Sequence, residues 1–442
     1  MGLPISTVNL VLKTASATRA GFGTPLFQTM HMGALNRVIS FQDTTASGEV
    51  FSAAHPASLA AKGYKGATPS VTNFKIGRVA ASLVLTPNTP VAGKTYSFLI
   101  SNGITSGVCS FTASGGDDEG DVVDDLLTDI ASFATIASEV TATKVGTLAA
   151  STLSLVATGD FTITGISGFS EEYTATETYE ASLAAIREED DDFYFFNSDT
   201  RDVAVQDALA SAIQPTSKTY FTASNEVEAI AGIYSVADTS IGSVIKQKNY
   251  SRSTAVFSHD ISDFPECAYV GVNAPHSPDE RSVVWDGREL FGVPVAKNTL
   301  GNKLTTTQMG YLDSRGMSYV TETSVGPRIL GGKMASGAWI DDIRTQDTII
   351  ARVQEALDTL VLNQAGSKLV GGRSGIALVD AAIRKALTPF LASNALESFD
   401  TDMTAATIDQ STRTLSNVKF TAVLKGAILR VVVNGTAVNQ EV

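Results

Sequence analysis

Short apolar strands alternate with helical segments between residues 193 and 257, and this order restricts the fold more than any other feature. The strand-like runs cover 193–196, 219–222 and 255–257, and the helical runs between them cover 203–213 and 241–248. Helices that connect one strand to the next are typical of β-α-β crossovers, which build a parallel sheet. The sequence therefore predicts an α/β core here. No glycine-rich fingerprint follows these strands, so a dinucleotide site is not supported.

Acidic residues are concentrated in one stretch of the chain. The net charge is −14, and residues 82–192 contain 18 acids against Lys94, Lys144 and Arg187, a balance of −15. Between 82 and 180 the sequence is also rich in Ala, Ser, Thr and Gly, with β-like runs and one predicted helix at 122–133. We interpret 82–180 as an acidic β-rich domain inserted into another domain and facing solvent. The chain offers no basic face of the kind that nucleic acids require, which excludes direct binding.

The chain of 442 residues is too long for one ordinary domain. Helices are predicted at 347–363, with an apolar stripe that ends at Leu360 and Val361, and at 375–391, with Ser374 as the N-cap. A strand-like run follows at 418–424. We expect an α/β (α+β) multidomain fold. Its expected parts are an N-terminal arm and linker (1–20), the first part of the core (21–81), the inserted domain (82–180), an α/β core domain (181–300), a C-terminal α+β domain completed by terminal strands (301–434) and a tail (435–442).

Both ends of the chain carry β-like segments. In the first, residues 3–13, Val8, Leu10 and Leu12 alternate with Asn9 and Val11, which indicates a strand with one apolar face. Polar residues 14–19 follow as a compliant linker. Residues 427–433 form the second segment. A terminal strand can pair within its own subunit or extend into another one. The residues expected to pair between subunits are Ile5, Val8, Leu10, Leu12, Ile428, Val431 and Val433.

Two acidic runs and two glycine-rich stretches are weak candidates for ligand sites. The runs at 117–121 and 188–192 could chelate a cation, but neither has EF-hand spacing, and solvated loops explain them better. The stretch at 371–375 lacks the ending of a P-loop, and the stretch at 331–337 has no partner motif. The sequence therefore predicts no metal site and no cofactor.

The remaining reactive side chains do not form a catalytic motif. None of the four histidines, His31, His55, His259 and His276, has metal-ligand or triad spacing. Cys109 and Cys267 are far apart in sequence and are expected to be buried free thiols in a reducing compartment. No signal peptide and no run of about 18 apolar residues is present, so neither secretion nor membrane insertion is expected. We expect a protein that is not an enzyme.

Several stretches of the chain are similar to one known family. They are residues 16–26, Phe-Lys-Ile-Gly-Arg at 74–78, Leu-Thr-Thr-Thr-Gln-Met at 304–309, Tyr319, and Met-Ala-Ser-Gly-Ala-Trp-Ile-Asp-Asp at 334–342 with Arg344 and Asp347. Together they resemble the tail sheath proteins of contractile-tailed bacteriophages over roughly 1–80 and 181–442. The stretch from 334 is the most specific, and its family-motif core is Met334, Gly337, Trp339, Asp341, Asp342 and Arg344.

The resemblance implies a structural role in a virion. Sheath subunits of this kind form hexameric rings that stack helically around a tail tube, and their terminal arms pair with sheets of neighbouring subunits. Contraction drives the tube through the host envelope for genome ejection. The implied partners are identical subunits, the tail tube protein, and baseplate and tail terminator proteins. The implied location is the tail sheath of the virion, after assembly in the host cytoplasm.

Three other functions remain open at this point. A sheath of a non-viral contractile injection machine would have the same features. A tail tube subunit or another virion protein is a second alternative, although tube proteins are usually shorter and mostly β. An α/β hydrolase is a third alternative, because a site can be assembled in three dimensions, for example around His259 and nearby acids.

Overall fold

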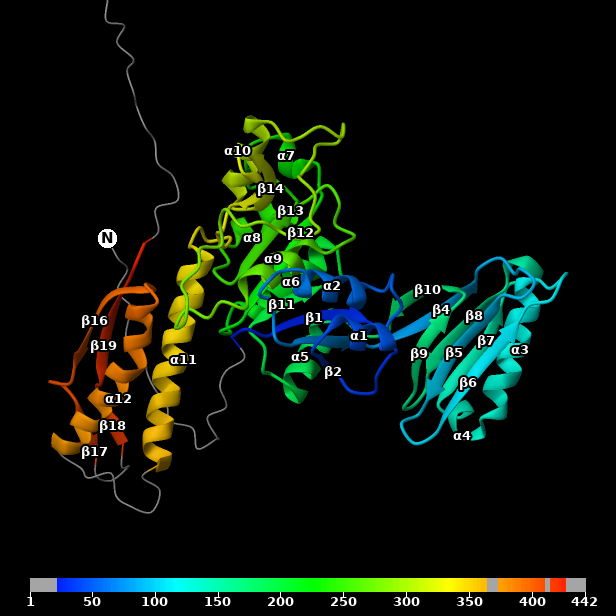
Figure 1. Cartoon of the computed structure of the whole chain (residues 1–442), viewed down its shortest axis with the longest axis horizontal. Coiled ribbons are helices and arrows are strands. Elements are labelled where there is room, and N and C mark those ends of the chain that lie inside the picture. Colours follow the sequence, from blue (N-terminus) through cyan, green and yellow to red (C-terminus); the bar gives the residue numbers. More distant parts are fainter. Residues whose placement is uncertain (1–21, 364–372, 410–413, 427–442) are drawn as a thin grey trace, which may run out of the picture. The chain divides into compact units, whose positions relative to one another are not determined.

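A computed structural model of the chain describes residues 22–363, 373–409 and 414–426 (Figure 1). These residues belong to two compact units. One unit, here the sheet unit, holds the described residues up to Pro275 together with Arg288–Ala338. The other, here the C-terminal unit, holds His276–Gly287 and the described residues from Trp339 onward. The expected α/β multidomain class is confirmed, and the expected boundary at residue 300 falls inside the sheet unit.

The sheet unit is built on a mixed sheet of eight strands among the described residues. In order across the sheet they are β15 (Gly326–Leu330), β14 (Ser318–Thr323), β13 (Ser253–Phe257), β12 (Thr219–Ser224), β11 (Phe195–Ser198), β1 (Pro25–Met30), β3 (Phe74–Val79) and β2 (Val38–Phe41). The six strands from β14 to β3 run parallel, as the β-α-β pattern predicts. The two outer strands, β15 and β2, are antiparallel to their neighbours.

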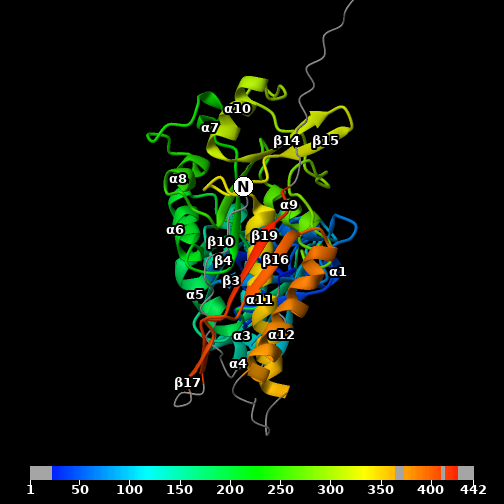
Figure 2. The ribbon, with the colours of Figure 1, turned by 90° about the vertical axis from the view of Figure 1, so that its left-hand side faces the viewer.

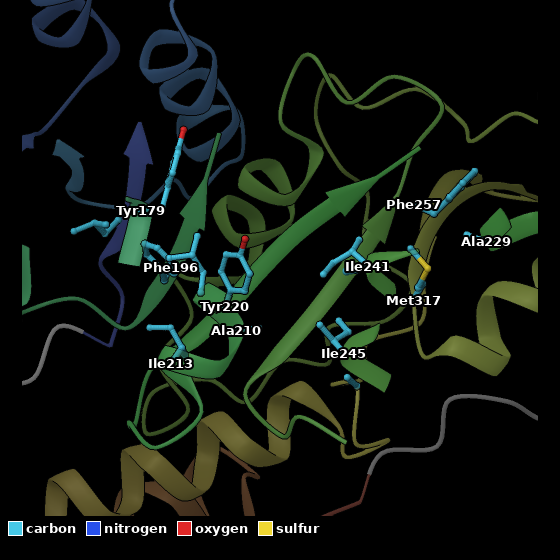
Figure 3. Close-up of a cluster of buried hydrophobic side chains, with 14 of the residues drawn as sticks. Tyr179, Phe196, Ala210, Ile213, Tyr220, Ala229, Ile241, Ile245, Phe257 and Met317 are labelled. Atoms are coloured by element: carbon cyan, nitrogen blue, oxygen red, sulfur yellow. The ribbon is translucent and has the colours of Figure 1, made fainter. Parts of the chain in front are cut away.

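Both faces of this sheet are apolar, as a parallel sheet requires. Neighbouring residues alternate between the faces, so Phe196 and Tyr220 lie in one core (Figure 3) while Phe195 and Phe221 pack on the other side. The helices that contact the sheet or one another around it are α1 (Thr44–Val50), α2 (Pro56–Lys65), α5 (Tyr179–Glu189), α6 (Val203–Ile213), α7 (Glu228–Ala231), α8 (Ile241–Gln247), α9 (Pro265–Asn273) and α10 (Thr306–Arg315). The two buried cysteines are both free, as predicted.

The acidic stretch folds as a two-sheet sandwich with one long helix. One sheet has the order β10-β4-β8-β7 and the other β6-β5-β9. The elements are β4 (Ala81–Pro87), β5 (Thr95–Ser101), β6 (Ser106–Thr112), α3 (Glu119–Ser132), α4 (Ala134–Ala137), β7 (Val140–Val145), β8 (Thr152–Ala157), β9 (Thr162–Ser167) and β10 (Phe169–Ala175), with a 3₁₀ turn at Leu148–Ala150. The helix predicted at 122–133 begins three residues earlier, because Asp118 and Asp121 form a capping box there.

The C-terminal unit contains two long helices and two small sheets. Its elements are α11 (Ile340–Asn363), α12 (Arg373–Ala392), β16 (Leu396–Asp402), β17 (Thr407–Asp409), β18 (Thr414–Ser416) and β19 (Lys419–Leu424). Figure 2 shows β16 and β19 side by side next to α12. Its core includes Ile349, Val353, Ile383, Leu387 and Phe390.

Three details of these helices differ from the predictions. Helix α11 begins at Ile340, seven residues before the predicted start at 347, because buried polar residues such as Arg344 and Thr348 interrupt the apolar pattern of its first turns. Ser374 is not an N-cap, because it lies inside α12. Val361 is predicted to lie in the apolar stripe, but 44 % of it is exposed, and the core contacts Leu357 and Leu360 but not Val361.

A segment from the middle of the chain, residues 276–287, is held against these helices. The Arg352 guanidinium of α11 donates to Asp279 Oδ2 over 2.7 Å, and it also pairs with Glu355. Ser393, after the end of α12, donates its hydroxyl to the Pro278 carbonyl over 2.6 Å. Burial opposes the charge on Asp279, but hydrogen bonds from Ser277 and Arg352 outweigh it and hold the pKa of this carboxyl below its usual value. An ion pair that is mostly shielded from solvent therefore fixes this segment.

In the part of the chain that the structure describes, no helix is both long and apolar enough to cross a bilayer.

The first prediction concerns the close packing of α2 against α9. A Cβ added at Gly271 would lie 2.6 Å from the Gly63 carbonyl oxygen and 2.8 Å from Tyr64 Cα, so Gly271→Ala forces two helix backbones apart. We expect a loss of about 2 kcal/mol in the free energy of unfolding, measured by urea denaturation. The matched control is Gly310→Ala in α10, where a Cβ meets nothing within 4 Å, and a gain of about 0.5–1 kcal/mol is expected. Equal effects at both positions would contradict this explanation.

The second prediction concerns the ion pair between Asp279 and Arg352. Asp279→Asn is expected to cost about 2 kcal/mol of stability at neutral pH, because it leaves a buried guanidinium with a weaker partner. The pKa of Asp279 is depressed in the folded chain, so its contribution is present at neutral pH and is lost as the pH falls through the folded-state pKa. The difference between variant and wild type in thermal melts should therefore shrink in acid.

The control for this variant is Asp124→Asn. Asp124 forms an exposed ion pair with Lys144, and its loss should cost about 0.5 kcal/mol or less. An Asp279→Asn effect as small as this control would show that the buried pair does not hold the segment.

Candidate functional site

An incomplete β-sheet is the main candidate for a functional surface. Among the described residues, β16 pairs with β19 and neither strand pairs with any other. The two strands are antiparallel, with Phe399 opposite Ala422 and Asp400 opposite Thr421. Leu396 and Ala422 are buried in the core formed with α12. The sheet therefore has one supported face and two edges whose backbone groups have no partner strand in the described chain.

An open edge of this kind can accept another strand. A two-stranded ribbon is marginally stable alone, and packing against a helix, or a third strand, makes it stable. Unpaired N–H and C=O groups on its edges are a template for pairing with a further segment. The two edges differ in charge, since β16 carries exposed Glu397, Asp400 and Asp402, whereas β19 and the residue after its end carry Lys419 and Lys425. The sheet can therefore accept a strand on each side.

The residues predicted to pair between subunits lie outside the described residues. This applies to the N-terminal set Ile5, Val8, Leu10 and Leu12, and to the C-terminal set Ile428, Val431 and Val433. The chain is described up to Gly426, two residues after the end of β19. The structure thus contains the sheet that could receive a terminal arm, and the pairing itself stays a prediction.

The family-motif residues connect the two units in sequence. Met334 is fully buried in the sheet unit, and its N–H donates to the Ala338 carbonyl over 2.8 Å. Gly337 closes this turn with φ of +93°, a conformation that favours glycine. The Ala335 N–H donates to the carbonyl of Ser253 in β13, and the Ser336 N–H donates to the carbonyl of Tyr250 in the loop before β13. These hydrogen bonds attach the turn to the sheet. From Trp339 onward the motif belongs to the C-terminal unit.

The second half of the motif lines a small cavity at the start of α11. Its volume is about 10 Å³, close to the minimum that holds one water molecule. The lining residues are His276, Pro278, Ser282, Val283, Trp285, Asp341, Arg344 and Thr345. All of them belong to the C-terminal unit. The structure thus brings Asp341 and Arg344 together here with residues from the 276–287 segment.

Asp341 is the unusual group in this cavity. Burial, then the negative charges of Asp342 and Asp286, raise the pKa of Asp341 to about 7. Its Oδ1 is buried and accepts no hydrogen bond from the described residues. Burial also raises the pKa of Asp342. The sequence motif singled out Asp341 and Asp342. It did not indicate that Asp286 influences the pKa of Asp341, because Asp286 is 55 positions before Asp341 in the sequence.

The two acidic runs have structural roles. In the first, Asp118 caps the N-terminus of α3. In the second, Asp190 pairs with Lys75 Nζ at 2.6 Å and Asp191 with Lys218 Nζ at 3.2 Å, and the lysine side chains are only 5 % and 7 % exposed. In the described ranges, no group of three or more His, Cys, Asp or Glu side chains is arranged to hold a metal ion.

The carboxyl ends of the parallel strands, where α/β proteins often bind ligands, hold a buried polar network. Asp199 accepts hydrogen bonds from Thr29 Oγ1 and Tyr179 Oη, each over 2.6 Å. Arg201 forms an ion pair of 2.9 Å with Glu266, whose pKa is raised by burial. The sequence pattern did not indicate this network, because its members come from strands and helices far apart in the sequence. His259 is not among the residues that line the cavity described above.

Comparisons with known proteins complete this description. No family model matches the chain, and no curated protein matches it. Among solved structures, the chain is similar to the crystal structure of the sheath tail protein Lin1278 from Listeria innocua. The TM-score is 0.48 at 11 % sequence identity, and the match covers 92 % of this chain and 96 % of that one.

Proposed function

We propose that this protein is a structural subunit of a contractile tail sheath, and that it polymerises with identical subunits by strand addition. The observation that carries the proposal is the β16–β19 sheet, which is supported by α12 on one face and lacks a partner strand at both edges among the described residues. The motif resemblance at 334–342 supports the same function from the sequence.

The chemistry of strand addition suits such an assembly. Main-chain hydrogen bonds supply affinity, and alternate side chains of the added strand fill pockets and set the register. Val8, Leu10 and Leu12 have the alternation that this requires, and so have the apolar residues at 428–433. Two terminal arms and two open edges allow each subunit to give two strands and to receive two. Links of this kind depend little on sequence, so they can persist while the domains that they join rotate.

In this proposal the subunits form hexameric rings that stack helically around a tail tube protein. Baseplate and tail terminator proteins bind the two ends of the stack. Contraction releases the free-energy difference between two packings of the same domains and drives the tube through the host envelope, so no bond is cleaved. The assembled protein is part of the virion, and assembly takes place in the host cytoplasm. A non-viral injection machine would use the same subunit chemistry.

The acidic sandwich domain has a separate role in this proposal. Its helix α3 begins in a run of acids, with Glu119 and Asp121 in its first turn. Copies of this domain repeated on a polymer would repel one another when they approach within a Debye length, about 10 Å at 0.1 M salt. The domain would therefore keep neighbouring copies and neighbouring particles apart.

Arm substitutions test the proposal. The triple variant Val8→Asp, Leu10→Asp and Leu12→Asp places three charges on the apolar face of the N-terminal strand. We expect the subunit to remain folded but to lose assembly, because an unpaired buried carboxylate is costly. Assembly is measured by sedimentation velocity and by negative-stain electron microscopy, and folding by circular dichroism melting.

The matched control adds the same charge to the opposite face, with Thr7→Asp, Asn9→Asp and Val11→Asp. This variant should still form hollow tubes or stacked rings whenever the wild type does. Normal tubes from the first variant, or equal loss in both, would argue against strand addition through this face.

A further inference from the structure

The loop at the tip of the β5–β6 hairpin holds an asparagine and a glycine side by side. The two strands pair with Ser101 opposite Ser106, so residues 102–105 connect them. Asn102 and Gly103 are consecutive in this loop, and Gly103 is exposed with φ of +82°. Glycine adopts this conformation without strain and has no side chain to shield its own nitrogen. The Gly103 nitrogen can therefore approach the side-chain carbonyl carbon of Asn102.

The side-chain carbonyl of Asn102 is polarised by the loop. Its Oδ1 accepts hydrogen bonds from the backbone N–H groups of Ile104, over 3.1 Å, and Thr105, over 2.9 Å. The Thr105 hydroxyl also donates to it over 3.2 Å. Donors that already point at a carbonyl oxygen stabilise the negative charge that develops there when the carbonyl carbon is attacked. The turn thus supplies an oxyanion hole for a reaction at Asn102 Cγ.

The Gly103 nitrogen is hydrogen-bonded to a group that can help to remove its proton. Its N–H donates to Ser101 Oγ over 3.0 Å, and the Ser101 hydroxyl donates in turn to the Thr105 carbonyl over 3.0 Å. A hydroxyl has one proton and two lone pairs, so the bond to Thr105 leaves a lone pair for the Gly103 N–H. Ser101 therefore assists the transfer of this proton towards solvent, as a general base does.

We propose that residues 101–105 form a self-modification site, at which Asn102 converts to aspartate and isoaspartate. The Gly103 nitrogen attacks Asn102 Cγ, the N–Cγ bond forms, and the Cγ–Nδ2 bond breaks. Nδ2 leaves as ammonia and takes up a proton in place of the one that Gly103 loses, and the product is a cyclic imide. Water then opens the imide at either carbonyl. The reaction involves no oxidation or reduction, and water is its co-reactant.

The fold favours this reaction at Asn102 by holding nucleophile and carbonyl in adjacent residues of a hydrogen-bonded turn, which lowers the entropy cost of ring closure. The loop is open to water, since Ile104 is 91 % exposed. Asn197 shows the opposite situation, because it is fully buried in β11. Its Nδ2 donates to the Phe221 carbonyl, and its Oδ1 accepts from the Tyr64 hydroxyl. These bonds fix the amide of Asn197 away from solvent, so we expect no conversion there.

Conversion changes the hairpin tip in two ways. Aspartate at position 102 adds one negative charge to the acidic sandwich domain. Isoaspartate also lengthens the main chain by a methylene group, which disturbs the hydrogen bond of 3.2 Å from the Asn102 N–H to the Thr105 carbonyl. This inference goes beyond the proposed function and does not depend on assembly.

Peptide mapping by mass spectrometry tests the proposal. The full-length protein is incubated in mildly alkaline buffer, both folded and unfolded in guanidinium, and aspartate and isoaspartate at position 102 are measured over time. We expect conversion about tenfold faster in the folded chain, because preorganised donors contribute at least this much in enzymes. In the unfolded chain Asn102 should convert at a rate similar to that of Asn434, since glycine also follows Asn434.

Two variants examine the role of Ser101. Ser101→Ala removes the acceptor of the Gly103 N–H, so it should slow conversion in the folded chain and leave the rate in the unfolded chain unchanged. Ser106→Ala is the matched control, because Ser106 lies opposite Ser101 in β6 and outside the loop. It should leave both rates unchanged. Circular dichroism verifies that the variants are folded.

Four results would overturn the proposal. They are the absence of conversion at Asn102, aspartate formed without isoaspartate, a rate in the folded chain no higher than in the unfolded chain, and a Ser101→Ala variant that slows both states or neither. The second would indicate direct hydrolysis instead of an imide. Because none of these readouts requires polymers, failure of this proposal and failure of the sheath proposal are distinguishable.

Discussion

Backbone hydrogen bonding is the constraint on which the rest of this structure depends. Each strand exposes a row of N–H and C=O groups that must find partners when they are buried. In the sheet unit this requirement is met by six parallel strands, with antiparallel β2 and β15 at their two sides. In the C-terminal unit it is met only between β16 and β19 within the described chain. The difference marks the second sheet as the place where another strand can be added.

Carboxylates have three different roles in this acidic chain, and the environment decides which. Asp118 accepts hydrogen bonds from the backbone N–H groups of Gly120 and Asp121 and so caps α3. Asp190 and Asp191 pair with lysines that the fold has buried, which compensates the cost of removing those amines from water. At Asp341, burial and the charges of Asp342 and Asp286 outweigh a backbone hydrogen bond, so the pKa of its carboxyl is raised to about 7. The same residue type thus caps a helix, pairs with a buried amine, or has the pKa of its carboxyl raised by burial, according to its surroundings.

The success of the sequence predictions depended on whether the relevant interaction was local. The predicted helix at 203–213 agrees with α6 at both ends, because Asp202 caps it and its apolar residues repeat at helical spacing. The parallel order of β11, β12 and β13 also followed from strand and helix alternation. In contrast, the start of α11 was missed by seven residues. Its first turns bury Arg344, Thr345, Asp347 and Thr348, and no periodicity of apolar residues can indicate a buried polar face.

Sequence alone determined the α/β core, the acidic β-rich stretch and the long C-terminal helices, because these depend on spacing between near neighbours, while the terminal strand-like segments stay a prediction. The motif at 334–342 also selected Asp341 and Asp342 as residues of interest. Only the tertiary structure decided that the charge of Asp286 raises the pKa of Asp341, that Arg352 holds Asp279, and that β16 and β19 lack further partners in the described chain. These contacts join residues tens of positions apart, and their energies depend on burial, which arises only when the chain has packed.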